Sequence, residues 1–281
     1  MRRLTFLLAP VFLFVALPAA AQQRPLVTED PETIGSGRML IEAGMDYGRD
    51  VLFSASGLNG NLVRFPIIGI STGISSIAEI QMDGALFQRL SITDRRPAAL
   101  AHMLTVTGDS TSGIDDAVVA TKFRILSEGA RRPAIGMRFG TKMPNASNED
   151  GLGLDTIDTF GTLLVAKTIR SVRVVGNVGL LILGDPTRGD RQNDEIGYGL
   201  SFARALTDAT EVVGEVNGRL ETRAGEPPPG TESRSMMRFG GRYTHGMFRI
   251  DAALAIGLTA QDPGIGFATG FTYVFDAFKI P

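Results

Sequence analysis

The sequence of 281 residues has no cysteine, no tryptophan and only two histidines, His102 and His245. Without cysteine the chain has no disulfide framework, no thiolate metal site and no cysteine nucleophile. The formal net charge of −2 gives no basic excess for binding nucleic acid. The composition therefore predicts no metal site, no cofactor and no nucleic-acid partner.

Long hydrophobic runs are also scarce, and the clearest one lies at the start. Residues 4–17 are largely apolar, follow two arginines and precede three alanines at 19–21. This order of charge, apolar run and small residues is typical of a cleaved signal peptide. The run is shorter than the roughly 20 residues that a membrane-spanning helix needs. We predict a signal peptide over residues 1–21 and an exported mature chain.

Glycine is abundant, with 34 residues, and much of the chain alternates between polar and apolar residues. Arg138 and Lys142 share one face of their segment, whereas Met137, Phe139 and Thr141 fill the other. A β-strand turns successive side chains to opposite faces, so this period of two predicts strands. Twelve are predicted, over residues 39–48, 61–72, 77–91, 114–126, 132–143, 158–169, 172–183, 194–205, 210–222, 233–244, 247–258 and 265–276.

Two of these strands, 61–72 and 158–169, alternate poorly. A third, 77–91, places Glu79, Gln81, Asp83 and Arg89 on one face, but Phe87 also falls on that polar face.

The connections between the strands alternate in length. Short ones lie near residues 75–76, 127–131, 170–171, 207–208 and 245–246, and long ones span 49–60, 93–113, 144–157, 185–193, 223–232 and 259–264. This pattern favours a transmembrane antiparallel up-and-down β-barrel over residues 39–281, with short periplasmic turns and longer extracellular loops. A soluble sandwich is the alternative, because one sequence does not show which face is inside. Charged residues in mid-strand and an aromatic row on the last strand favour the membrane barrel.

Residues 22–38 precede the first strand and are too few for a globular plug. They form an N-terminal arm that either enters the lumen from the periplasmic side or remains a loose tail.

The polar faces of the strands predict the residues that line the lumen and the solute pathway. If the hairpin of strands 210–222 and 233–244 is symmetric about Pro227, Glu211 faces Arg242 and Glu215 faces Arg238. Arginines of this region would form a positive wall opposite acidic residues of other strands, an arrangement that orients a dipolar solute. The predicted lining residues are Glu42, Asp46, Glu79, Asp83, Lys122, Arg124, Arg138, Glu211, Glu215, Arg219, Arg234, Arg238, Arg242, Arg249 and Asp251.

Several short motifs resemble one family of exported proteins. They are residues 24–31 (RPLVTEDP) with Thr33 and Gly35, then 41–44, 73–81, 115–116 with 121–124, 142–147 and 151–155 with Asp158. In these the chain is similar to the outer-membrane proteins grouped under the MetA pathway of phenol degradation. The resemblance implies an outer-membrane barrel that lets small, aromatic or hydrophobic molecules pass, and it carries over no functional residues.

The leading hypothesis is therefore a passive channel or transporter, not an enzyme, in the outer membrane of a Gram-negative-type bacterium. Its expected partners are outer-membrane lipid and lipopolysaccharide, the barrel-assembly machinery and a small-molecule solute. A non-transporting structural or surface-interaction barrel is the alternative. A lipid-modifying enzyme is a third hypothesis, for which His102 with Ser110 would be the candidate residues. Clustered carboxylates at 149–158 fit a solvated acidic outer loop better than a calcium site.

Overall fold

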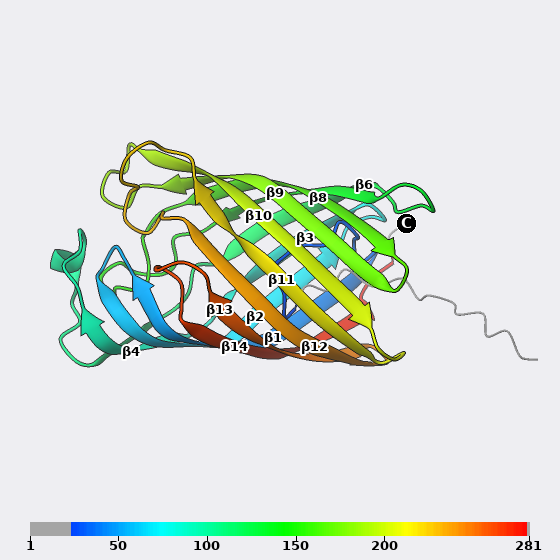
Figure 1. Ribbon diagram of the computed structural model, residues 1–281, viewed down its shortest axis with the longest axis horizontal. Coiled ribbons are helices and arrows are strands. Elements are labelled where there is room, and N and C mark those ends of the chain that lie inside the picture. Colours follow the sequence, from blue (N-terminus) through cyan, green and yellow to red (C-terminus); the bar gives the residue numbers. More distant parts are fainter. Residues whose placement is uncertain (1–23, 280–281) are drawn as a thin grey trace, which may run out of the picture.

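The computed structural model describes residues 24–279, which form a closed antiparallel barrel of strongly tilted strands (Figure 1). The predicted signal peptide lies outside these described residues. β1 pairs with both β2 and β14, which closes the wall, and the predicted all-β up-and-down barrel is confirmed. The strands are β1 (Arg38–Phe53), β2 (Leu58–Gly73), β3 (Ala78–Ala85), β4 (Gln88–Arg95), β5 (Ser110–Gly113), β6 (Val118–Leu126), β7 (Ala134–Lys142), β8 (Asp158–Ile169), β9 (Val172–Gly184), β10 (Gln192–Ala205), β11 (Thr210–Glu221), β12 (Arg234–His245), β13 (Phe248–Gly257) and β14 (Ile265–Asp276).

Two positions in the wall are each shared by a pair of consecutive strands. β3 and β4 both pair with β2, and β5 pairs with β4 while β6 pairs with β3. The described wall therefore has twelve strand positions, as the sequence predicts. One short 3₁₀ helix, Ala101–Met103, lies in the connection between β4 and β5. No helix within residues 24–279 is long and apolar enough to span a membrane.

The alternation of side chains separates an outer apolar face from an inner face. Along β13, Leu254 is 56% exposed whereas its neighbour Ala253 is 3% exposed. Val216 on β11 is also exposed, and Glu215 beside it is buried. Large apolar side chains therefore cover the outside of the barrel, which suits a lipid environment.

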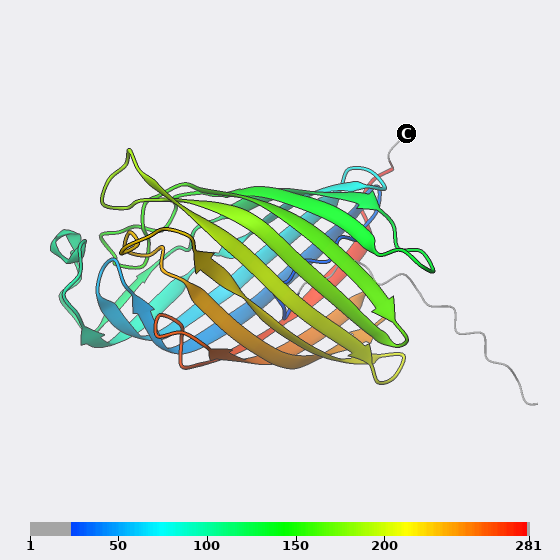
Figure 2. The same cartoon turned by 45° about the horizontal axis from the view of Figure 1, so that its top comes forward.

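The two ends of the barrel differ, as Figures 1 and 2 show. At one end, here called the turn end, short turns join the strands at 74–77, 127–133, 170–171, 206–209 and 246–247. At the other, the loop end, longer segments lie at 96–109, 143–157, 185–191, 222–233 and 258–264. Phe248, Tyr273 and Phe275 stack near the turn end, with ring centroids 4.5 and 5.3 Å apart. Such an aromatic group is typical of a membrane interface.

The predicted long loop over 49–60 is wrong, because β1 and β2 extend into it from both sides and only residues 54–57 connect them. The extension is stabilised by an apolar cluster inside the loop end. Its buried members are Val51, Leu58, Leu62, Leu90 and Leu152. Burial of these apolar side chains stabilises the extension of β1 and β2 beyond the other strands of the wall.

The prediction that Arg89 shares a face with Glu79 is also wrong. Leu86 and Phe87, between β3 and β4, are both exposed, so the alternation shifts by one residue there. Gln88 consequently points inward at 2% exposure, and Arg89 is exposed on the outside. A shift of one residue exchanges the two faces of every following position.

The poor alternation of strands 61–72 and 158–169 has two different causes. β2 carries register shifts against β1, between Gly44 and Asp46 and between Gly48 and Val51. β8 pairs regularly with both neighbours, but its inward residues near the turn end are apolar. Of these, Ala166 is in a small buried cluster with Ala134 and Val175.

Candidate functional site

The segment before β1, residues 24–37, passes through the interior of the barrel and is called the arm below (Figure 2). Its residues bond to inward side chains and main-chain groups of strands on several sides of the wall. The contacts concentrate toward the turn end.

The first described residue of the arm, Arg24, is held by β12, β13 and β14. Its Nη2 donates to the carbonyl of Thr269 at 2.7 Å, and its own carbonyl accepts from Nε of Arg242 at 2.7 Å. Its guanidinium lies 3.6 Å from the carboxylate of Asp251. Gly44 and Gly270 are cross-strand partners, and a Cβ at either position would collide with Arg24. Paired glycines therefore make the space that this side chain occupies.

Glu215 on β11 binds the main chain of the arm. Its Oε2 accepts from the backbone N–H of Thr28 at 2.7 Å, and its two oxygens accept from that of Val27 at 2.9 and 3.0 Å. Arg238 also lies 2.9 Å from this carboxylate. A buried carboxylate with several N–H donors and a cation nearby is well compensated, which stabilises the arm in this position.

The middle of the arm inserts Glu29 between the walls. Nζ of Lys122 lies 2.7 Å from Glu29 and 3.0 Å from Glu79, and the Lys122 residue is fully buried. Burial alone would raise the pKa of Glu29, but Lys122 and Arg138 hold that pKa below its usual value. The amide of Asn177 on β9 pairs with the N–H and carbonyl of Glu29 at 2.7 and 2.8 Å.

The last part of the arm is tied to the turn end. Arg173 forms a two-pronged pair with Asp30, with both N–O distances at 2.7 Å. Arg124 lies 2.6 Å from Glu32, and Glu79 accepts from the N–H of Ile34 at 2.7 Å. The arm thus contacts opposite walls at once and occupies the lumen near the turn end.

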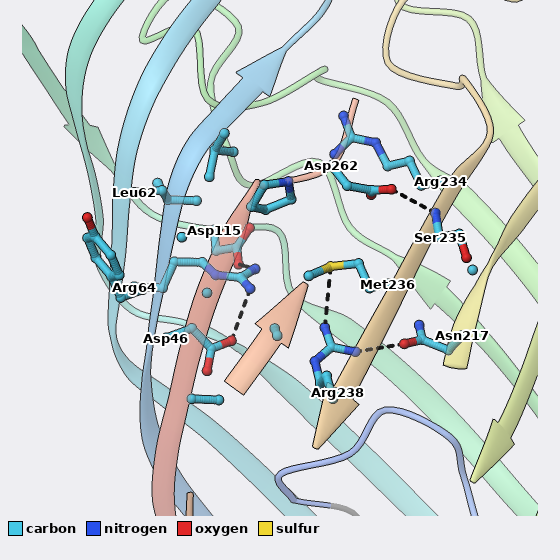
Figure 3. Close-up of a pocket in the computed structure, with 18 of the residues that line it drawn as sticks. Asp46, Leu62, Arg64, Asp115, Asn217, Arg234, Ser235, Met236, Arg238 and Asp262 are labelled. Atoms are coloured by element: carbon cyan, nitrogen blue, oxygen red, sulfur yellow. Dashed lines mark hydrogen bonds and ion pairs between the residues drawn. The ribbon is translucent and has the colours of Figure 1, made fainter. Parts of the chain in front are cut away.

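Above the arm, toward the loop end, the interior contains a cavity of about 520 Å³, called the upper pocket. Figure 3 shows Arg64 and Asp46 on one side of it and Arg238 with Asn217 on the other. The volume falls within the range of about 300–1,000 Å³ that is usual for small-molecule sites. Apolar side chains, including Val51, Leu62 and Leu152, line the same cavity.

All the predicted lining residues lie at inward positions of their strands, but they do not form one pathway. Asp46, Arg219, Arg234 and Arg238 line the upper pocket. The others lie outside its lining. Those that bond or pair with the arm itself are Glu79, Lys122, Arg124, Arg138, Glu215, Arg242 and Asp251. Glu42 also accepts from the backbone N–H of Arg24 in the arm, and from Thr272. The rest are Asp83, which lies 3.7 Å from Arg138, and Glu211 and Arg249, which lie 3.8 Å apart.

The register of β11 against β12 is confirmed, since Glu211 faces Arg242 and Glu215 faces Arg238. The predicted separation into a positive and an acidic wall is not what the structure shows. Arg242 and Arg249 both lie within 3.8 Å of Glu211, and on the opposite side Lys122 lies between Glu29 and Glu79. Most charges are neutralised locally because neighbouring strands carry the opposite sign at the same height.

Two groups of interior residues are not indicated by the sequence pattern. Arg64 pairs with Asp46 at 3.1 Å and with Asp115 at 3.3 Å, but it lies in the strand whose alternation is broken by register shifts. The second group comprises the acidic residues of the arm. The run Glu29-Asp30 followed by Glu32 was the only available signal for it, and nothing in the spacing identifies the partners.

The histidine considered for catalysis, His102, is exposed, and its Nδ1 lies 3.0 Å from the carbonyl of Ala99. Ser110 is exposed on β5. No hydrogen bond between the two is present in the described part of the chain, which leaves a Ser–His nucleophile without geometric support.

No family model matches the sequence, and no curated protein matches it either. Solved structures do match the fold. An outer membrane channel from Pseudomonas putida F1 superposes with a TM-score of 0.60 at 12% identity, covering 88% of this chain and 98% of that one. The NanC porin superposes with a TM-score of 0.50 at 8% identity, covering 84% and 98%. At such low identity these matches show that the chain has the fold of outer-membrane β-barrels.

Proposed function

We propose that the protein is an outer-membrane channel or transporter through which small solutes pass, with the arm as the part that controls passage. The observation that supports this most directly is the arrangement inside the barrel. A cavity of about 520 Å³ lies toward the loop end, and a segment without regular secondary structure fills the lumen below it. The arm is held by side-chain hydrogen bonds and ion pairs rather than by pairing into the sheet.

The orientation and setting are part of this proposal. After removal of the leader at 1–21, the chain would insert through the barrel-assembly machinery, with the turn end in the periplasm and the loop end among lipopolysaccharide. The outward apolar residues support contact with lipid. The motif resemblance to the outer-membrane proteins of the MetA pathway of phenol degradation supports aromatic or hydrophobic solutes.

The experiment is a conductance measurement in planar bilayers on the mature chain and on a variant that lacks residues 24–34. A channel gated by the arm should conduct weakly when intact and severalfold more when the arm is deleted, because no other described segment crosses the lumen at that level. The single variant Arg223→Met, in the exposed loop after β11, serves as a folded control that keeps the arm.

The second candidate is a structural or surface-interaction barrel with a permanently closed lumen. The many bonds between the arm and opposite walls favour it. If the arm-deleted variant folds, as judged by heat-modifiable migration in gels, but conducts no more than the intact chain, the closed barrel is the better description and the channel proposal is wrong.

A further inference from the structure

The lining of the upper pocket combines apolar and charged side chains. The apolar ones come from the loop-end cluster and from β9, among them Leu62, Leu152, Leu181 and Leu183. The charged ones lie on both sides: Arg219, Arg234 and Arg238 come from β11 and β12, and Asp46, Arg64 and Asp115 lie opposite. A cavity with leucines and charged groups close together suits a molecule that has an apolar body and one polar end.

Arg234 differs from the other arginines of this pocket. Arg64 pairs with Asp46 and Asp115, Arg219 lies 3.2 Å from Glu195, and Arg238 lies 2.9 Å from Glu215. Within residues 24–279, no carboxylate lies at ion-pair distance from Arg234.

The guanidinium of Arg234 is only weakly bonded to the protein. Its Nε is buried without a hydrogen-bond partner, and its Nη2 donates to the carbonyl of Leu52 at 3.3 Å, a long bond. A buried donor that makes no bond costs about 1–3 kcal/mol. The guanidinium of Arg234 therefore has hydrogen-bonding capacity that the protein leaves largely unused.

The strand register places a second positive charge directly beside Arg234. Arg234 and Arg219 are direct cross-strand partners at the loop end of β11 and β12. Like charges directly opposite each other are destabilising. Asp262, Glu232 and Glu195 attract Arg234 only at longer range. The Oδ2 of Asp262 accepts instead from the N–H of Ser235 at 2.9 Å and from the hydroxyl of Thr259 at 2.6 Å.

Arg234 also occupies a junction. It lines both the upper pocket and a smaller cavity of about 190 Å³, and Phe53 and Leu152 line both as well. An anionic group at Arg234 would therefore have apolar surface next to it for the rest of the ligand.

We infer that the upper pocket binds a small amphipathic monoanion, an aryl or alkyl carboxylate, with its carboxylate on the guanidinium of Arg234 and its apolar body against the leucines of the lining. This inference rests on the proposed function, because it names the class of solute that the channel would take up. A guanidinium holds a carboxylate through two parallel N–H donors, which fits the unused donors of this side chain.

The test uses 4-phenylbutyrate and its uncharged amide as probes of equal shape. Binding to the full mature chain in lipid nanodiscs is measured by equilibrium dialysis, with empty nanodiscs subtracted for partition into lipid. We expect the carboxylate to bind at least tenfold more tightly than the amide, because a hydrogen bond to a charged group contributes about that factor to the affinity.

Three variants locate the site. Arg234→Met should abolish the preference for the carboxylate, whereas Arg234→Lys should keep part of it. Arg223→Met removes the same charge from the exposed loop eleven positions earlier and should leave the preference unchanged. This control separates binding at the pocket from general attraction of anions to the loop end.

The inference is overturned if neither probe binds, if the amide binds as tightly as the carboxylate, or if Arg234→Met retains the preference. The cationic analogue 4-phenylbutylamine serves as a third probe. If it binds more tightly than 4-phenylbutyrate, the inference is also overturned, and Asp46 and Asp115 are the dominant charges of the pocket. Because binding is measured without transport, a chain that binds the carboxylate but never conducts refutes the channel proposal alone. A chain that conducts but shows no preference refutes this inference alone.

Discussion

Glu215 is one of the wall carboxylates that hold the arm. It accepts from two successive backbone N–H groups of the arm and lies beside Arg238 on the neighbouring strand. Main-chain donors of an irregular segment have no strand partner, so a buried acceptor is needed to compensate them. Glu79 does the same for Ile34 at the other end of the arm. The position of the arm therefore depends on inward polar side chains, together with the packing of Ile34 against Leu40 and Val274.

Replacing Glu215 by Gln should loosen the arm without changing the size of the side chain. The amide loses the negative charge and presents one N–H₂ donor to the N–H groups of the arm. Loss of one hydrogen bond to a charged acceptor weakens docking by about 1.5–3 kcal/mol. Amide hydrogen exchange of Val27 and Thr28, followed by mass spectrometry, should accelerate roughly tenfold or more.

Glu221→Gln is the matched control for this measurement. Glu221 lies on the same strand at the loop end, and its backbone N–H bonds to Ser233, away from the arm. Equal exchange rates at Val27 and Thr28 in wild type and in Glu215→Gln would show that this carboxylate does not hold the arm.

At the residue scale, the sequence predicted contacts within a hairpin but not contacts of the arm. The pairing of Glu215 with Arg238 follows from two alternating strands and one loop, so a single midpoint sets the whole register. The bond between Glu215 and Thr28 joins residues 187 positions apart. The arm has no periodicity, and no pattern in it indicates which of many inward carboxylates it meets.

The strands carry the clearest physical signal of the chain, the contrast between their two faces. Leu254 on β13 faces outward beside Phe239 and Phe267 as cross-strand partners. Ala255, the next residue, is buried and lines the upper pocket. The predicted lumen and lipid faces follow this contrast wherever the strand is continuous. They fail past the break at Leu86 and Phe87, because local sequence does not show where a strand shifts by one residue.

Leu254→Arg and Ala255→Arg test the assignment of the two faces. An arginine on the lipid face near the middle of the membrane costs about 2–4 kcal/mol, whereas at position 255 it enters a polar cavity and should cost much less. The measurement is the free energy of unfolding in lipid vesicles with guanidinium chloride. Position 255 is a better inward control than the buried Ala253, because Ala255 borders open volume. Similar destabilisation by the two variants would contradict the assignment.

For the whole molecule, the sequence predicted the barrel, its strand number and its two unlike ends. These features follow from local patterns that repeat in almost every strand and turn, so each strand adds independent support for the same architecture. Whether the lumen is open was not predictable, because it depends on where residues 24–37 lie relative to every strand. The structure places them across the lumen, so any passage from the upper pocket to the turn end requires the arm to move or to be narrow enough to leave a path beside it.

The chain's lack of cysteine allows a direct test of that movement. A Cβ built on Gly199 of β10 lies 3.4 Å from the Cβ of Thr28, close to the separation of roughly 3.5–4.5 Å found in disulfides. The double variant Thr28→Cys with Gly199→Cys should therefore form a disulfide that fixes the arm to the wall. In proteoliposomes we expect the oxidised variant to block solute-driven swelling and dithiothreitol to restore it to about the wild-type rate. Thr28→Cys alone should show no response to dithiothreitol. Swelling of the oxidised double variant at the wild-type rate would mean that solutes pass beside a stationary arm, and gating by its displacement would be wrong.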